Sequence, residues 1–379
     1  KAGKKIVERE ITEIATPGVT LSEHVLNSRR NNYILSVNPP RGRGGRTGVA
    51  FADVSTGEFA LCEVPEGGLA EIRHMLAPSE VLLPEAWRRR VPQELEGLPM
   101  AAMPDWIYTD TAGYDRLVQH FGTHSLRGFG VEELAQAHGA AAALLEYLKE
   151  TQRNGLRQVG RLTRFDRESV MSLDAATQRN LELAGRSVDG AEEGSLISML
   201  DQTRTPMGGR LLRRWVVQPL RQAEAVNRRL DAVQAMVEAH GARGELRGGL
   251  ARLSDLERLI SRISSGRTGP RDLGYLRASL QELPEVKRLA GSAAGQADGV
   301  LAEAAGQVEL HSELLRRLEQ SVADEPPPNL RDGGAIRDGF HEPLDELRSM
   351  ARDSRKVIAG IRDDLVRQTG IQSLKVGYN

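Results

Sequence analysis

The hydrophobic pattern divides the chain into a mixed part and a helical part. In the first part, short apolar runs predict strands at 32–37, at 81–83 and on both sides of a turn at 55–57 within 49–62. Longer amphipathic stretches predict helices at 66–76, 114–121 and 131–148, and residues 84–104 read as turns. Strands that alternate with helices predict a mixed α/β sheet over residues 24–150.

From Thr151 onward the pattern predicts almost only helices. Ser195 is expected to cap a short helix, and Thr205 to cap a second one that has Pro206 in its first turn and stops before Pro219. Further helices are predicted at 223–239, 248–263, from about Pro270, at 297–321 and at 342–369. The last would be roughly 40 Å long, and Leu344, Met350, Ile358 and Leu365 recur along it as a packing stripe.

Length and charge limit the possible functions. A chain of 379 residues suffices for two or three domains. Its 51 Lys and Arg against 52 Asp and Glu argue against DNA contact over most of the surface but allow local basic patches. The run Arg153, Arg157, Arg161, Arg164 and Arg167 could meet a phosphate backbone. We favour a solvated face near a domain joint.

Few residues suggest chemistry. The one cysteine, Cys62, excludes an internal disulfide and a cysteine metal cluster. His120 and His124 are four apart, but Phe-Gly-Thr between them weakens a helix, so ordinary histidines are favoured over metal ligands. Residues 38–48 are rich in glycine and arginine, yet no G-x-x-x-x-G-K-[ST] pattern occurs, which favours a hairpin loop over a phosphate site. No membrane span or signal peptide is visible, and we expect a cytoplasmic protein.

One stretch carries a specific resemblance. Residues 174–182 read Asp-Ala-Ala-Thr-Gln-Arg-Asn-Leu-Glu, and residues 195–215 read Ser-Leu-Ile-Ser-Met-Leu-Asp-Gln-Thr-Arg-Thr-Pro-Met-Gly-Gly-Arg-Leu-Leu-Arg-Arg-Trp. Together with Ser254–Ile263 they closely resemble the core, or lever, domain of the MutS family, which recognises mismatched DNA. Helical spacing alone predicts only a helical domain of unknown purpose.

The resemblance implies a domain plan for the whole chain. Residues 1–23, with a possible strand at 6–14, resemble the exit of the mismatch-binding domain and its linker. Residues 24–150 resemble the connector domain, an α/β domain with an RNase H-like fold, on the strings 52–58 and 121–130. Residues 151–371 would be the mostly α-helical core or lever domain, and 372–379 the start of a truncated clamp. The chain is therefore expected to be a central fragment of a multidomain protein.

The resemblance also implies a function. A full-length member binds mismatched double-stranded DNA, forms a homodimer through its ATPase domain, acts as a DNA-dependent ATPase that uses ATP, ADP and Mg²⁺, and recruits MutL. This segment would relay nucleotide state between the ATPase and the DNA clamp and offer a docking surface for MutL, without enzymatic activity of its own and without a membrane partner.

No catalytic, cofactor-binding, metal or DNA-binding residue of this chain can be named from the resemblance. The nucleotide motifs and clamp contacts would lie downstream, and the mismatch-stacking phenylalanine upstream. Phe340-His341-Glu342 matches the family's Phe-x-Glu letters but lies too far along the chain to be that element.

Two other functions remain as alternatives. A MutS-like protein could hold DNA junctions during recombination instead of acting in repair. The RNase H-like fold also suggests the alternative that the protein is a nuclease, in which Asp53 would bind metal ions with Glu58, Glu80 or Asp105. Because those carboxylates have no diagnostic spacing, an aspartate that flanks a turn is the favoured interpretation of Asp53.

Overall fold

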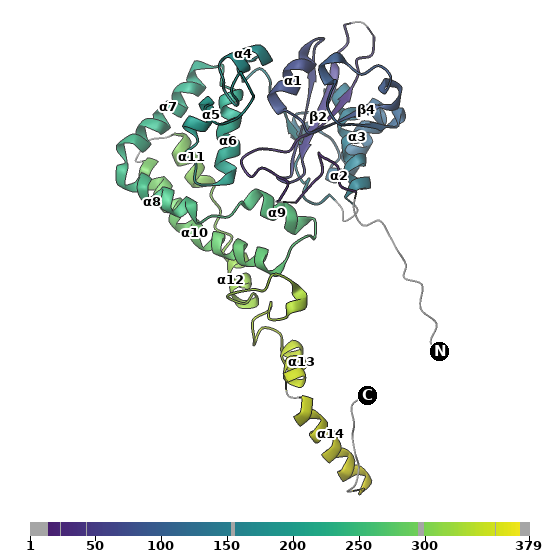
Figure 1. Cartoon of the computed structure of the whole chain (residues 1–379), viewed down its shortest axis with the longest axis vertical. Helices are drawn as coiled ribbons and strands as arrows, with labels where there is room; N and C mark the ends of the chain where they lie inside the picture. The colour runs from purple at the N-terminus through teal and green to yellow at the C-terminus, as the bar shows by residue number, and fades with distance from the viewer. Residues whose placement is uncertain are drawn as a thin grey trace. The chain divides into compact units, whose positions relative to one another are not determined.

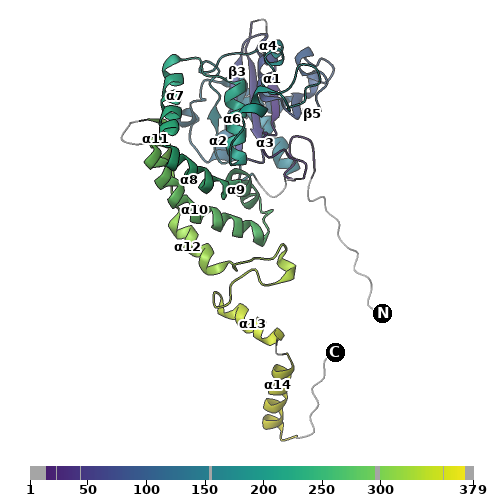
Figure 2. The same cartoon turned by 60° about the vertical axis from the view of Figure 1, so that its left-hand side comes forward.

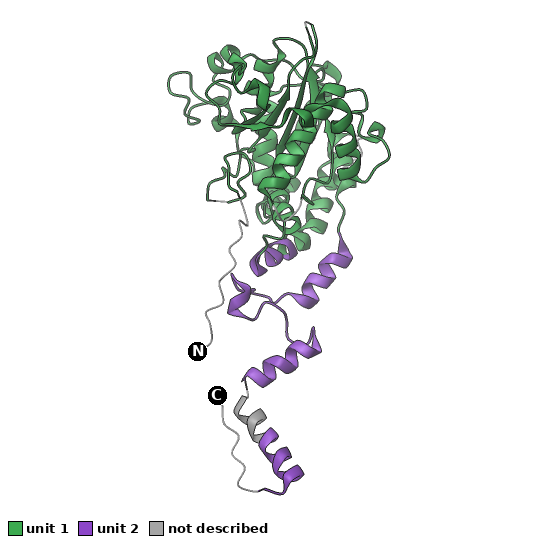
Figure 3. Cartoon of the chain, turned by 90° about the vertical axis from the view of Figure 1, so that its right-hand side faces the viewer, with its two compact units in different colours: residues 1–268, 278–310 green, residues 269–277, 311–379 purple. Residues whose placement is uncertain are grey.

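The computed structural model describes residues 14–22, 24–42, 44–152, 156–294, 299–352 and 354–371, with the side chains of 354–359 left out (Figure 1). The chain forms two compact units (Figure 3). Unit 1 comprises residues 1–268 and 278–310, and unit 2 comprises residues 269–277 and 311–379. Within the described residues, no helix is both long and apolar enough to cross a membrane.

Unit 1 begins with a six-stranded mixed sheet in the order β5-β4-β1-β2-β3-β6. Its strands are β1 (Ile34–Asn38), β2 (Thr47–Asp53), β3 (Glu58–Val64), β4 (Glu80–Pro84), β5 (Met100–Met103) and β6 (Thr163–Arg164). β1, β2 and β3 form an antiparallel meander, while β4 pairs parallel to β1, β5 to β4 and β6 to β3.

The predicted strands at 32–37, 49–62 and 81–83 are confirmed, and the loop at 38–48 joins two antiparallel strands as predicted. Two expectations were wrong. β5 lies in the stretch predicted as turns, and β6 lies in the part predicted as helix. Both are edge strands of four and two residues, too short to show a period of two.

Helices cover both faces of this sheet (Figure 1). Alternate strand residues such as Leu35 and Phe51 face α1 (Gly68–Leu76), while their neighbours Ile34 and Ala52 lie in a second core with the opposite helices. Those helices are α2 (Asp110–Phe121) and α3 (Ala135–Thr151). The three helices predicted in this region are therefore confirmed, with starts shifted by a few residues.

Glycines let α3 pack backbone to backbone against α2 and against Tyr108, which precedes α2. A Cβ atom on Gly113 would lie 2.6 Å from the His138 carbonyl carbon, and one on Gly139 would lie 2.2 Å from the Tyr108 carbonyl oxygen. No side chain fits at such distances, so both positions require glycine for the observed packing.

The rest of unit 1 is helical. It contains α4 (Ala175–Asn180), α5 (Leu196–Leu200), α6 (Pro206–Val217), α7 (Ala223–Glu238), α8 (His240–Ala251), α9 (Leu256–Ser264), α11 (Val300–Gln307) and part of α10 (Pro270–Ala294). Thr205 Oγ1 accepts the Gly208 N–H at 3.0 Å and Pro206 opens α6, which confirms the predicted cap. The Ser195 cap of α5 is likewise confirmed.

Two predicted helices are each interrupted. Residues 248–263 were expected to form one helix, but α8 ends at Ala251 and Asp255 caps α9 by accepting the Arg258 N–H at 3.3 Å. Residues 297–321 divide into α11 and α12 (Ser312–Ser321), with His311 at a positive φ of 46° between them. In both cases the apolar residues continue at helical spacing across the break. A side-chain cap interrupts the helical path in the first case, and a residue with positive φ does so in the second.

Unit 2 is built from α12, α13 (Glu342–Arg352) and α14 (Ser354–Thr369), together with the start of α10. Arg277 joins α10 to the chain after α12 by donating to the carbonyls of Val322 and Asp324, each at 2.8 Å. The predicted helix at 342–369 corresponds to α13 and α14, but residue 353 lies outside the described residues, so one continuous strut stays a prediction. The predicted strand at 6–14 and clamp entry at 372–379 also fall almost wholly outside them.

We expect Gly139→Ala to lower the free energy of unfolding by about 1–3 kcal/mol, because the added methyl group forces α3 away from Tyr108. Urea unfolding followed by circular dichroism measures the change. Gly291→Ala in α10 is the control, since a Cβ there meets nothing within 4 Å and should stabilise the helix by about 0.5–1 kcal/mol. Equal effects of the two substitutions would contradict the close packing.

Candidate functional site, an arginine joint between sheet and helices

Arginines from the helical part bind the sheet part of unit 1. Arg210, Arg213 and Arg214 share one face of α6 because they are spaced three and four residues apart. Figure 2 shows α6 lying against the sheet domain. We call this set of contacts, together with those of Arg258 and Ser261 on α9, the arginine joint.

Arg210 is one of the two most enclosed charges of the arginine joint, with only 4% of its surface exposed. It makes a bidentate pair with Asp255 at 2.7 and 2.8 Å, and it donates to Glu257 at 2.6 Å and to the Ser28 carbonyl at 2.8 Å. Burial alone would lower the pKa of Arg210, but its hydrogen bonds to Asp255 and Glu257 outweigh burial and raise that pKa. The guanidinium is therefore charged and holds the segment at Ser28, α6 and α9 together.

The α9 helix contributes two more contacts. Arg258, also 4% exposed, donates to the carbonyls of Asn27 and Arg30 at 2.9 and 2.8 Å. Ser261 Oγ donates to the Val54 carbonyl at 2.6 Å, just after β2. Since these acceptors are backbone atoms, the contacts fix the path of the chain into and out of the sheet.

Arg214 contacts Glu58, the first residue of β3. Its guanidinium donates to Glu58 at 2.6 Å and to the Tyr33 hydroxyl at 2.9 Å, and Tyr33 in turn donates to Glu58 at 3.0 Å. Burial is the largest influence on Glu58 and raises the pKa of its carboxyl, although Arg214 and Tyr33 act against it. This triad is a partly desolvated link between α6 and the sheet. Each of its three side chains is hydrogen-bonded to the other two, so the loss of one weakens the remaining bond.

Glu192 is a second shared carboxylate. It accepts from Arg213 at 2.7 Å and from Arg30 Nε at 3.0 Å. Burial by itself raises the pKa of Glu192, but hydrogen bonds from the two arginines overcome it and leave that pKa below its ordinary value. Glu192 therefore acts as a charged bridge between α6 and the segment that leads into β1 (residues 14–22 and 24–33), which we call the entering segment.

The entering segment is also tied to the sheet. The buried carboxylate of Glu80 accepts the Gly18 N–H at 2.9 Å and the hydroxyl groups of Thr16 and Tyr147. Gln152 Nε2 donates to the Val19 carbonyl at 2.9 Å. The first part of the entering segment is thus fixed to the sheet domain, ahead of the part that contacts the arginine joint.

The four carboxylates of the nuclease alternative do not form a metal site. Asp53 is buried and accepts from Asn31, the Asn32 N–H and Ser55, while Glu58 and Glu80 have the partners given above. Asp105 accepts the Ala86 N–H at 3.0 Å. Among the described residues, no group of three or more His, Cys, Asp or Glu side chains is placed to hold a metal ion. The favoured reading of Asp53, an aspartate that anchors a turn, matches its bonds to Ser55.

The other singled-out residues lie apart from this joint or have ordinary roles. His120 bonds the Val159 carbonyl at 3.0 Å, and His124 is exposed. Burial raises the pKa of Cys62 to about 12, which leaves its thiol protonated and unreactive. Within the described part of the arginine run, Arg157, Arg161 and Arg164 are exposed and Arg167 pairs with Glu71, while Arg153 lies outside it. Phe340 precedes α13 in unit 2.

Comparison with known proteins places this architecture in a family. The family model described as MutS domain II matches residues 32–163, which hold the sheet. The model described as MutS domain III matches residues 176–375, more than half of the chain. The chain belongs to the MutS family.

Individual MutS relatives match along the whole chain. The DNA mismatch repair protein MutS of Salinibacter ruber is 38% identical over 380 residues, covering 99% of this chain and 41% of the relative. The proteins of the same name from Chlorobaculum tepidum and Bacteroides fragilis are 39% and 35% identical, and the match covers 43% of each. The chain therefore spans less than half the length of the curated MutS relatives it matches.

The sequence indicates the MutS-like segment that carries the arginine joint, but it does not indicate which residues the arginines of that segment contact. Three arginines on one face of a helix that also carries Trp215 could have indicated a buried contact. Their partners, however, lie 21 to 182 positions away in the chain, beyond the reach of any local pattern.

Arg210→Met should lower the free energy of unfolding by about 3–5 kcal/mol, because Asp255 and Glu257 lose the guanidinium that they share at a buried position. Urea unfolding followed by tryptophan fluorescence tests this. Arg252→Met is the matched control, since the Arg252–Glu282 pair is exposed and should contribute less than about 1 kcal/mol. Similar losses for both variants would contradict the central role of Arg210.

Glu192→Gln should lower stability by about 1 kcal/mol at pH 7. The pKa of Glu192 is depressed in the folded state, so its contribution is present above the ordinary value of 4.5 and is lost as pH falls through the lower folded pKa. The difference from wild type should therefore shrink below about pH 4.5. Unfolding midpoints at about pH 7, 5 and 3.5 test this, with Glu193→Gln as the exposed neighbouring control. A difference that does not change with pH would contradict the charged bridge.

Proposed function

We propose that this chain is the central segment of a DNA mismatch-recognition protein and that it transmits movement between parts of that protein. Its sheet domain corresponds to the connector and its helices to the core or lever. The meander of β1, β2 and β3 beside parallel β4 and β5 supports an RNase H-like connector fold.

The arginine joint carries the relay proposal. A mechanical relay needs rigid elements whose contacts are discrete. Arg210 and Arg258 supply such contacts, because each is nearly fully buried and is fixed by two or more acceptors. A displacement of α6 and α9 therefore moves the connector with them or breaks the joint.

The longer protein would bind mismatched double-stranded DNA, act as a homodimeric DNA-dependent ATPase with ATP, ADP and Mg²⁺, and recruit MutL in the cytoplasm. Support comes from the relatives, each named a DNA mismatch repair protein. This chain carries no phosphate-binding G-x-x-x-x-G-K-[ST] pattern, so we assign none of its residues to the nucleotide. Its connector would provide the MutL docking surface.

The first experiment uses the full-length parent protein. At near-physiological salt, it should bind a duplex with a G·T mismatch more tightly than a matched duplex or a four-way junction, and ATP should convert it to a form that slides off open DNA ends. Fluorescence anisotropy on open and end-blocked DNA measures both steps. Equal binding to matched and mismatched duplex, with tighter junction binding, would favour the recombination function instead.

The relay is tested separately in the same parent protein. Arg214→Gln breaks the link from α6 to Glu58 and Tyr33. We expect mismatch affinity without nucleotide to stay within about twofold and the ATP-triggered sliding rate to change by about fivefold or more, which corresponds to roughly 1 kcal/mol. Arg252→Gln, on an exposed pair, is the control. A sliding rate equal to that of the control would show that the joint is structural only.

A further inference from the structure

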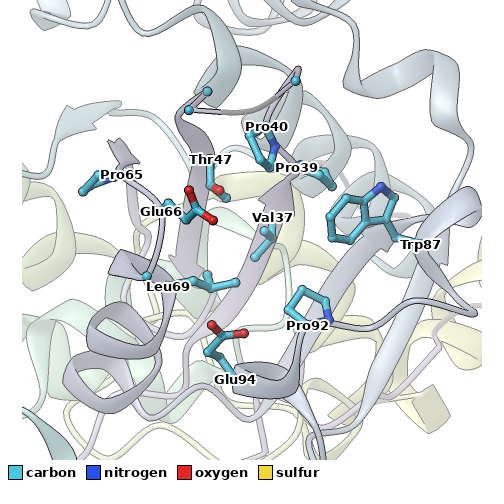
Figure 4. Close-up of a pocket in the computed structure, with 14 residues that line it drawn as sticks. Val37, Pro39, Pro40, Thr47, Pro65, Glu66, Leu69, Trp87, Pro92 and Glu94 are labelled. Atoms are coloured by element: carbon cyan, nitrogen blue, oxygen red, sulfur yellow. The ribbon is translucent and has the colours of Figure 1, made fainter.

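A pocket of about 520 Å³ lies on the sheet domain, at residues that the arginine joint does not use (Figure 4). Its walls come from the β1–β2 loop, the turn before α1 and the segment that follows β4. A volume of this size accommodates a side chain with its flanking backbone.

The walls of the pocket are mostly apolar, and prolines restrain several of their positions. Val37, Leu69 and the Trp87 indole line it, together with prolines from three separate segments. Those prolines are Pro39, Pro40, Pro65 and Pro92. Because proline has a fixed φ, these four positions lose little conformational freedom when a ligand binds, while Gly42, Gly44, Gly45 and Gly67 of the same loops also line the pocket.

Two carboxylates face this apolar space. Figure 4 shows the side chains of Glu66 and Glu94 directed into it from opposite walls. Neither carboxylate has an ion-pair partner among the described residues. Of the nearby cations, Arg46 pairs with Glu63 at 3.3 Å and Arg73 donates to the backbone carbonyls of Glu94 and Glu96, while Arg41 and Arg88 are exposed and do not line the pocket.

This combination selects the class of ligand. Two carboxylates repel the phosphates of nucleic acid, and a purely apolar peptide would leave both of them desolvated without a partner. An arginine or lysine side chain satisfies both features, because its aliphatic stem packs on apolar walls while its charged end meets the carboxylates. An aromatic wall such as Trp87 adds attraction for a cation.

We propose that this pocket, which we call the Trp87 pocket, binds a basic side chain presented by an extended segment of a partner protein. The recognition elements are the carboxylates of Glu66 and Glu94 above the apolar surface of Val37, Leu69 and Trp87. The proposal does not depend on mismatch binding or on the relay, since none of these residues belongs to the arginine joint.

The test uses the 379-residue chain and a fluorescein-labelled peptide, Pro-Leu-Arg-Leu-Ser, blocked at its C-terminus. A second peptide replaces the arginine with citrulline, which keeps the shape and removes the charge. Fluorescence anisotropy should show binding of the arginine peptide and about tenfold weaker binding of the citrulline peptide. Equal affinity of the two peptides, or no binding of either at millimolar protein, would overturn the proposal.

Variants locate the binding. The double variant Glu66→Gln with Glu94→Gln should bind the arginine peptide about tenfold more weakly than the wild type does, and its affinity for the citrulline peptide should be unchanged. Glu85→Gln with Glu96→Gln removes the same charge from exposed positions that do not line the pocket, and should change affinity less than twofold. Equal losses in both double variants would show long-range attraction rather than a site and would overturn the proposal. Trp87→Leu, checked for an unchanged melting temperature, should lower the affinity for both peptides, because both contact the apolar wall.

The chain itself offers a competing occupant. Arg41 is exposed in the β1–β2 loop beside the pocket. If Arg41→Ala strengthens peptide binding tenfold or more, the pocket holds its own arginine in the free protein, and the docking proposal is wrong. Unchanged affinity in Arg41→Ala supports an external partner.

Discussion

The removal of the Arg210 guanidinium from water is the constraint on which the arrangement of unit 1 depends. A buried charge must be neutralised where it lies, because a stranded one costs several kcal/mol. Arg210 meets this requirement with Asp255, Glu257 and the Ser28 carbonyl. The position of α6 therefore determines where α9 begins and where the entering segment passes. Asp255 is used twice, since it also caps α9.

The apolar core and the polar joint have different physical roles. Burial on both faces of the sheet, around Phe51 and Phe59, supplies the main driving force for folding the connector. Such contacts are not directional, and they would tolerate a shifted lever. The joint adds direction: Ser261 at Val54 and Arg214 at Glu58 both act at the ends of β2 and β3. The orientation of the helices relative to the sheet is thus specified at the turn between β2 and β3, rather than across the face of the sheet.

How far the sequence predicts this structure depends on the range of each interaction. The hairpin of β2 and β3 and the Thr205–Pro206 start of α6 were predicted because their signals lie within a few residues. The break between α8 and α9 was missed because Leu250, Leu253 and Leu256 continue the helical period across it. β5 and β6 were missed because pairing with β4 and β3, not local pattern, makes them strands. The MutS resemblance located the helical segment but named none of the joint's pairs, nor the Trp87 pocket.

The type of contact in the joint bears on how a relay would work. Apolar surfaces can slide in small steps, since their attraction varies smoothly with the area in contact. A charge-assisted hydrogen bond at 2.6–2.9 Å, such as those of Arg210 and Arg214, is either made or lost over a fraction of an ångström. Several such bonds that share carboxylates break together, because each arginine relies on partners that others hold in place. In the proposed relay, the connector therefore follows the lever as one body up to a threshold and separates from it beyond that point. This behaviour is what a two-state transmission requires.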